Sequence, residues 1–157
     1  AYIGMTRTEI NEYMRPFVTK VIEPMINTLA LKIIHDHGDS GDIILLASAT
    51  NELIVQPIAK RLDIQNVIGT QVKFINDKCT GEYIPPSALG EGKLQLVQQW
   101  MQKNNFDDFS GVTFYSDSIN DLPLLEAVDF PKAVNPDAML EKISLERGWE
   151  IIDLPIL

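Results

Sequence analysis

The stretch "GVTFYSDSINDLPLLEAV", residues 111–128, shows most clearly how this chain is built. It starts with a continuous apolar run, which is typical of a strand buried on both faces of a parallel sheet. It ends with a segment that we interpret as a helix, and Asp117 and Asp121 stand where the strand gives way to it. A buried strand followed directly by a helix is the repeating unit of α/β domains.

The same alternation extends along the chain in both directions. The run "DIILLASA", residues 42–49, predicts a second buried strand, and residues 51–62 predict the helix after it. Residues 71–84 alternate apolar and polar side chains around Asn76 and Asp77, which predicts a β-hairpin. We also expect a helix, a strand, a helix and a strand over residues 89–103, 130–134, 135–148 and 149–153. From residue 38 onward the sequence therefore predicts an α/β fold with a parallel sheet flanked by helices.

The N-terminal segment has a different, helical pattern. Thr6 and Glu9 form a capping box, and apolar residues then recur at three- and four-residue steps from Ile10 onward. Pro16 and Pro24 divide the segment, because proline removes a hydrogen bond inside a helix. We expect two or three helices here, the last running from about Pro24 to residue 37.

The composition limits the possible partners. The 157 residues suit one globular domain, and 13 basic against 22 acidic residues give a net charge of −9. This charge argues against a nucleic-acid surface and against attraction to anionic lipid. The single cysteine, Cys79, cannot form an internal disulfide and is expected to fill space in the hairpin. No apolar run is long enough to cross a membrane, and no signal peptide is recognisable, so we expect a cytoplasmic protein.

Three candidate functional positions fall near the ends of the predicted strands, where ligands bind in open α/β sheets. Each also has a purely structural interpretation. Ser48 or Thr50 alone is explained as a cap of the next helix, and Lys93 alone as a solvated surface residue. Asp117 and Asp121 alone are explained as well by a structural role as by a cation site. In the structural role, they are a helix cap and a first-turn acid favoured by the helix dipole.

Taken together, these positions resemble three motifs of the haloacid dehalogenase superfamily of phosphohydrolases. The segments that carry the resemblance are "IILLASAT" for the second motif, "GEGK" for the third and "YSDSIND" for the fourth. The amino-acid sequence around them is most similar to that of the phosphoserine-phosphatase-like branch, subfamily IB. The resemblance implies a Rossmann-like core over residues 38–157. Residues 1–37 would then be the remainder of a helical cap and its return to the core.

The resemblance also implies roles for the candidate residues in the hydrolysis of a small phosphorylated metabolite. Asp117 would bind Mg²⁺ directly or through water, and Asp121 would hold that metal shell in place. Ser48 would donate a hydrogen bond to a phosphoryl oxygen, and the backbone around Ala49 would add N–H donors. Lys93 would neutralise the phosphate and the nucleophile. A dianionic ester needs such positive charge to approach a site lined with carboxylates.

The chain departs from the family pattern at the first motif. No Asp-x-Asp sequence occurs among its 157 residues, so the nucleophilic aspartate of the family is not in this chain. The strand before that motif, which lies in the family between the strands of the second and fourth motifs, is expected to be missing too. We therefore expect the chain alone to be inactive and to have an incomplete sheet that favours association. A phosphotransferase, or a non-catalytic relative that binds a phosphate ligand or a protein, remains an alternative.

Overall fold

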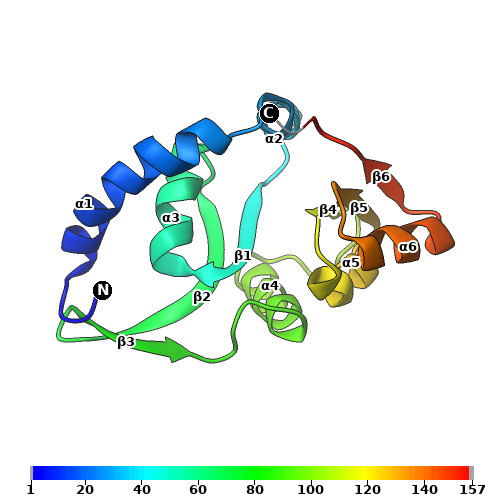
Figure 1. The fold of residues 1–157 in the computed structure, drawn as a ribbon. Helices are drawn as coiled ribbons and strands as arrows, with labels where there is room; N and C mark the ends of the chain where they lie inside the picture. The colour runs from blue at the N-terminus through cyan, green and yellow to red at the C-terminus, as the bar shows by residue number, and fades with distance from the viewer. Residues whose placement is uncertain (1, 156–157) are drawn as a thin grey trace. The chain divides into compact units, whose positions relative to one another are not determined.

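The computed structural model describes residues 2–155, which divide into two compact units between Ala88 and Leu89 (Figure 1). Each unit combines parallel strands with helices, so the predicted α/β fold is confirmed. The division between cap and core near residue 37 stays a prediction. None of the helices in residues 2–155 has both the length and the apolar composition that a membrane span requires.

The first unit contains a three-stranded sheet in the order β1-β2-β3. Its strands are β1 (Leu45–Asn51), β2 (Asn66–Ile75) and β3 (Lys78–Ile84). Helix α3 (Glu52–Arg61) connects the parallel pair β1 and β2. Strands β2 and β3 form the predicted hairpin, in which Asn76 and Asp77 have positive φ angles of 51° and 64°. Positive φ at both turn residues matches the right-handed twist of the two strands. Strand β2 starts at Asn66, five residues before the predicted start of the hairpin at residue 71.

Two helices precede this sheet. Helix α1 (Arg7–Phe17) begins at the predicted capping box of Thr6 and Glu9. It runs through Pro16 and continues into a π-helical turn over Val18–Ile22 and a 3₁₀ turn over Glu23–Met25. Helix α2 (Thr28–Asp39) starts four residues later than Pro24, because the Asn27 side chain caps it by accepting the N–H groups of Leu29 and Ala30.

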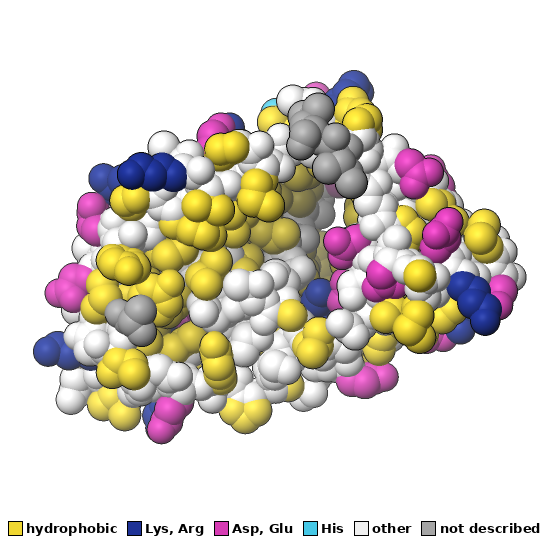
Figure 2. Space-filling view, viewed as in Figure 1, with side chains coloured by type: hydrophobic (Ala, Val, Ile, Leu, Met, Phe, Trp, Pro, Cys, Tyr) yellow, Lys and Arg dark blue, Asp and Glu magenta, His cyan; other side chains and the backbone are white. Residues whose placement is uncertain are grey.

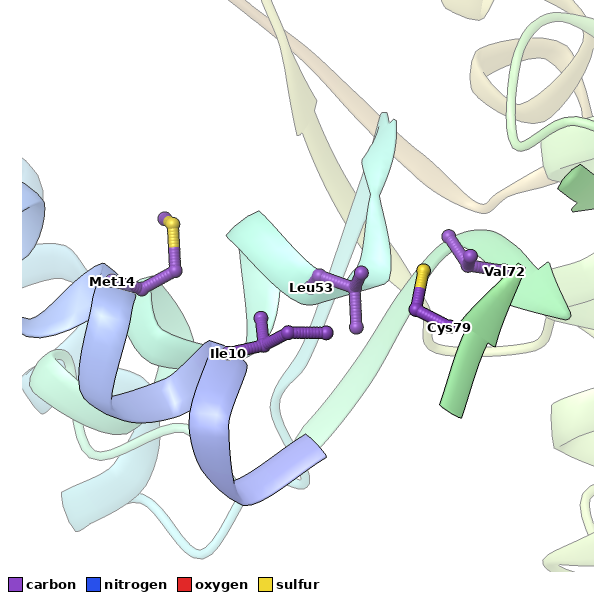
Figure 3. Packing of buried hydrophobic residues seen from close by; sticks show 5 residues of the cluster. All are labelled: Ile10, Met14, Leu53, Val72 and Cys79. Atoms are coloured by element: carbon purple, nitrogen blue, oxygen red, sulfur yellow. The ribbon is translucent and has the colours of Figure 1, made fainter. Parts of the chain in front are cut away.

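Five buried side chains hold the helices of the first unit against its sheet (Figure 3). They come from α1, α3 and the hairpin, and each is at most 5% exposed: Ile10, Met14, Leu53, Val72 and Cys79. Cys79 therefore fills space in the hairpin, as predicted. Burial of a Val, Leu, Ile or Met side chain contributes about 1.5–3 kcal/mol to folding, so this cluster stabilises the packing of α1 and α3 against the hairpin.

The second unit contains a parallel sheet in the order β4-β5-β6. Its strands are β4 (Thr113–Ser116), β5 (Phe130–Val134) and β6 (Glu150–Ile152). Its helices are α4 (Glu91–Lys103), α5 (Leu122–Ala127) and α6 (Ala138–Arg147), with a 3₁₀ turn over Ile119–Asp121 before α5. Leu125, Ala133 and Leu140 are fully buried and form its core.

The strands that precede the candidate motifs are edge strands. Within residues 2–155, β1 pairs only with β2, and β4 pairs only with β5. Each of them therefore has one edge with no strand beside it in its own sheet. Open edges of this kind expose a row of unpaired backbone N–H and C=O groups.

Candidate active site

The junction between β4 and α5 holds both aspartates of the predicted acidic pair. Asp117 is the first residue after β4, and its backbone C=O accepts the N–H of Asp137 at 2.8 Å. The side chain of Asp117 is exposed, and its carboxylate has no hydrogen bond or ion pair within the described part of the chain. Asp121 closes the 3₁₀ turn and is 7% exposed. The pair thus consists of one free, solvated carboxylate and one buried carboxylate.

Lys93 forms a buried ion pair with Asp121. The lysine Nζ lies 2.6 Å from Asp121 Oδ1, and the two side chains are 7% and 10% exposed. Ser116 Oγ donates a hydrogen bond of 2.6 Å to the other oxygen, Asp121 Oδ2. Buried charges are tolerated only when they are paired and hydrogen-bonded, and this network meets both conditions. The interpretation of Lys93 as a solvated surface lysine is therefore wrong.

This network constrains what Asp121 does. Both of its carboxylate oxygens already accept a hydrogen bond, one from Lys93 and one from Ser116. An ammonium group has three N–H donors, so Lys93 keeps two donors for other acceptors. The arrangement suits a supporting role for Asp121, which holds Lys93 in place, and leaves Asp117 as the carboxylate available for a cation.

The segment from Ser48 to Asn51 lies in the first unit, at the end of β1. Ser48 Oγ accepts the N–H of Thr50 at 3.2 Å, whereas Ala49 and Thr50 are exposed. Asn51 is the residue that caps α3, since its Oδ1 accepts the N–H of Ile54 at 3.2 Å. Neither Ser48 nor Thr50 is the cap, so the structural explanation of Ser48 no longer applies.

The donor atoms of the acidic pair have the chemistry that Mg²⁺ prefers. Asp117 and Asp121 offer carboxylate oxygens only, without the sulfur or imidazole ligands that other metals favour. Among residues 2–155, no group of three or more His, Cys, Asp or Glu side chains is close enough to hold an ion. The described residues therefore contain no complete cation site, and Asp117 is the carboxylate of the pair that has no protein partner.

Comparison with protein families adds an independent observation. The model of haloacid dehalogenase-like hydrolases matches residues 1–126. The chain belongs to this family. The family resemblance predicted from the three motifs is thereby confirmed.

Several known proteins are similar to most of this chain. It is 39% identical over 151 residues to a histidinol-phosphatase of Neisseria meningitidis, covering 94% of this chain and 68% of that protein. It is 35% identical over 120 residues to a phosphoserine phosphatase of Mycobacterium tuberculosis, covering 76% of this chain and 39% of that protein. A crystal structure of a protein of unknown function from Bordetella pertussis Tohama I superposes with a TM-score of 0.86 at 34% identity, covering 96% of this chain and 68% of that one. The chain spans about half the length of two further curated relatives, 54% and 50%.

Two residues of this candidate site were not predicted from the sequence. Ser116 binds Asp121, and Asp137 fixes the turn after Asp117 by accepting the N–H of Ile119 on Oδ2 at 2.9 Å. Asp137 also caps α6 through Oδ1, and the sequence "NPDAML" contains a recognisable signal for that cap. Ser116 is a small polar residue at the end of an apolar strand, which was the available signal for it.

Proposed function

We propose that this chain is the C-terminal portion of a magnesium-dependent phosphomonoesterase that acts through an aspartyl-phosphate. The observation that carries the proposal is the buried network of Lys93, Asp121 and Ser116 beside the free carboxylate of Asp117. The network supports the proposal because it holds a buried positive charge on Asp121, four residues after the free carboxylate of Asp117, and Asp117 directly follows β4 at the end of the strand where α/β proteins bind ligands. The family membership and the phosphatases among the relatives support the same chemistry.

The residues of the second unit have distinct proposed tasks. Asp117 would hold Mg²⁺. When bound, this ion would neutralise negative charge on the phosphoryl group. Lys93 donates two of its N–H bonds to phosphoryl oxygen and to the attacking carboxylate. Asp121 and Ser116 keep the Lys93 ammonium at a fixed position, so that little reorganisation is needed when the substrate arrives.

The residues of the first unit are proposed to bind the phosphoryl group. Ser48 Oγ uses a lone pair for the N–H of Thr50, which leaves its own O–H free to donate to a phosphoryl oxygen. The backbone of the exposed Ala49 lies beside it in the same turn. Because α3 begins at Glu52, directly after this turn, its positive N-terminal dipole also favours an anion here.

The attacking aspartate is proposed to lie outside this chain, because no Asp-x-Asp pair occurs in it. On this proposal residues 1–157 alone are inactive, residues 1–37 are the remainder of a cap, and the open edges of β1 and β4 are each available for pairing with a strand outside this chain. The single, buried Cys79 is compatible with a reducing cytoplasm. The substrate class is a small phosphorylated metabolite, and the relatives make histidinol phosphate and phosphoserine the first esters to test.

The test is phosphate release from these two esters by the full-length natural protein with Mg²⁺. Asp117→Asn removes the available ligand charge and is expected to abolish turnover, and removal of Mg²⁺ with a chelator is expected to do the same. Asp107→Asn serves as the matched control, since Asp107 is an exposed aspartate of the same unit. Normal turnover by the Asp117→Asn protein would refute the assignment.

A non-catalytic role is the second candidate, and the missing Asp-x-Asp pair favours it. In that case the natural protein binds inorganic phosphate or a protein partner but releases no phosphate from any ester. Transfer of the phosphoryl group to an acceptor other than water is recognised in the same assay, because the ester is consumed without release of inorganic phosphate.

A further inference from the structure

The pairing of β1 with β2 is interrupted where the proposed phosphate-binding turn lies. Ala47 pairs with Ile68 and Asn51 pairs with Thr70, so three residues of β1 are opposed by Gly69 alone. Ser48, Ala49 and Thr50 therefore form an outward bulge rather than a regular part of the strand. Bulges of this kind redirect backbone groups and are frequent beside active sites. Gly69 is the residue of β2 that faces this bulge, and Thr70, which pairs with Asn51, follows it.

Gly69 is a glycine because the bulge leaves no room for a side chain. A Cβ atom at this position would lie 2.9 Å from Glu52 Cα and 3.0 Å from both Glu52 N and Thr50 O. All three neighbours are backbone atoms, so they cannot move aside as the end of a side chain can. Any side chain at position 69 would have to displace the turn that leads from β1 into α3.

Thr70 holds the same turn from the neighbouring position. Its Oγ1 donates to the C=O of Ala49 at 2.8 Å and accepts the N–H of Ala88 at 3.0 Å. Thr70 is 5% exposed and Ala88 is fully buried, so water cannot easily replace either bond. One hydroxyl thus ties the bulge to the segment that comes five residues before Lys93 in the chain.

We propose that Gly69 and Thr70 are positioning residues that set the geometry of the phosphate-binding turn Ser48–Thr50. This inference rests on the proposed function of that turn. Thr70 fixes the direction of the Ala49 peptide, and Gly69 allows the turn to approach β2 closely enough for that bond to form. Neither residue contacts the substrate. They act through the turn, whose donors must meet the phosphoryl oxygens at a defined distance and angle.

The test compares Thr70→Val, Thr70→Ser and Gly69→Ala in the full-length natural protein. Valine keeps the shape of threonine but removes the hydroxyl, whereas serine keeps the hydroxyl. Thr80→Val is the matched control, because Thr80 Oγ1 also donates to a backbone C=O, that of Lys73 at 2.8 Å, and accepts an N–H, that of Glu82 at 3.2 Å. Gly38→Ala is the control for Gly69→Ala, because a Cβ at Gly38 meets only Ile44 Cδ1 at 3.9 Å.

The first measurement is inhibition by inorganic phosphate together with KM and kcat for histidinol phosphate. Thr70→Val and Gly69→Ala are expected to weaken phosphate binding about tenfold or more. Thr70→Ser and both controls are expected to stay within about twofold, since they leave the bond to Ala49 in place. Unchanged phosphate binding in folded Thr70→Val and Gly69→Ala proteins would overturn the proposal, and so would an equal loss in Thr80→Val. If Thr70→Val does not fold, the proposal is judged on the other two variants. Weaker phosphate binding in Gly69→Ala together with little change in Thr70→Ser supports it, and any other result overturns it.

The second measurement is amide hydrogen exchange over residues 48–51, which needs neither substrate nor activity. It separates a failure of this inference from a failure of the proposed function. If the unaltered protein neither binds phosphate nor hydrolyses esters, the proposed function is wrong. Faster exchange of the turn in Thr70→Val and Gly69→Ala, but not in Thr80→Val, would still support positioning. If residues 48–51 exchange in Thr70→Val and Gly69→Ala at the same rate as in the unaltered protein, the proposed positioning role is overturned.

Discussion

At the scale of single residues, the second unit buries three polar side chains, those of Lys93, Asp121 and Ser116. Their burial is not evident from the sequence around them. Replacing Asp121 by asparagine leaves the Lys93 charge buried without its counter-charge. Removing one partner of a buried ion pair typically costs about 3–5 kcal/mol. We therefore expect Asp121→Asn to lower the free energy of unfolding by that order, as measured by urea denaturation of the full-length natural protein.

The companion variant distinguishes charge burial from lost packing. Lys93→Met combined with Asp121→Leu removes both charges and is expected to recover much of the lost stability while remaining inactive. Unfolding of Asp121→Asn at the urea concentration of the unaltered protein would show that water reaches Lys93 and that the pair is not sealed.

Ser144 gives a second prediction at this scale. Its Oγ is buried and has no hydrogen-bond partner within residues 2–155. An unsatisfied buried hydroxyl costs about 1–3 kcal/mol, and alanine is also the better helix former in α6. Ser144→Ala is expected to raise the free energy of unfolding by about 1 kcal/mol. Ser40→Ala, at an exposed serine, is the control, and a destabilised Ser144→Ala protein would contradict the prediction.

At the scale of elements, the local signals in the sequence predicted most of the fold. Strand β5 spans the predicted residues, and the hairpin turns at Asn76 and Asp77 because both tolerate positive φ. The start of α2 was misplaced because the Asn27 cap competes with the signal of Pro24.

The sequence indicated those candidate residues that are polar and lie at the ends of strands or helices. It did not indicate residues that act through contacts distant in sequence. Ser48, Lys93 and Asp117 stand at strand or helix ends, which local patterns reveal. The bond from Thr70 to Ala49 spans 21 residues, and no local pattern in β2 indicates that its threonine supports a turn of β1. Such contacts depend on register, which only the folded sheet defines.

An ion pair between two elements of the first unit gives a pH-dependent prediction. Glu23, in the 3₁₀ turn after α1, accepts two hydrogen bonds from Arg61 at the end of α3. Its side-chain bond with Arg61 lowers the pKa of Glu23 below its ordinary value of 4.5. A lowered carboxyl pKa contributes stability that is present above pH 4.5 and is lost as the pH falls through the folded value.

Glu23→Gln is therefore expected to lower the melting temperature slightly near pH 7, and the difference is expected to shrink below pH 4.5. Thermal unfolding at a series of pH values measures this. In an Arg61→Gln background the Glu23→Gln change is expected to have no such pH dependence. The same difference at pH 3 as at pH 7 would contradict the assignment of the shift to Arg61.

At the scale of the whole chain, two features favour association of residues 1–157. Strands β1 and β4 each leave one edge open within the described residues. Figure 2 shows hydrophobic side chains gathered over the first unit. The exposed apolar residues of that unit include Ile3, Tyr13 and Met25, which are 72%, 59% and 75% exposed. Open strand edges and apolar patches are both sites of pairing with other chains, while the net charge of −9 opposes contact between copies.

These opposing effects can be separated by concentration and salt. About five backbone groups are unpaired on each edge, and each one that is truly buried costs roughly 1–3 kcal/mol. The summed cost is comparable to the total stability of a protein, about 5–15 kcal/mol. We therefore expect residues 1–157, produced alone, to associate increasingly with protein concentration in sedimentation velocity. Salt should strengthen the association, because it screens the repulsion between copies beyond about 10 Å at 0.1 M. The full-length natural protein, in which a further strand is proposed to cover these edges, should not show this behaviour. A monomeric 157-residue chain that unfolds cooperatively at every concentration would mean that the two edges are satisfied within the chain itself, and the proposed additional strand would lose its physical basis.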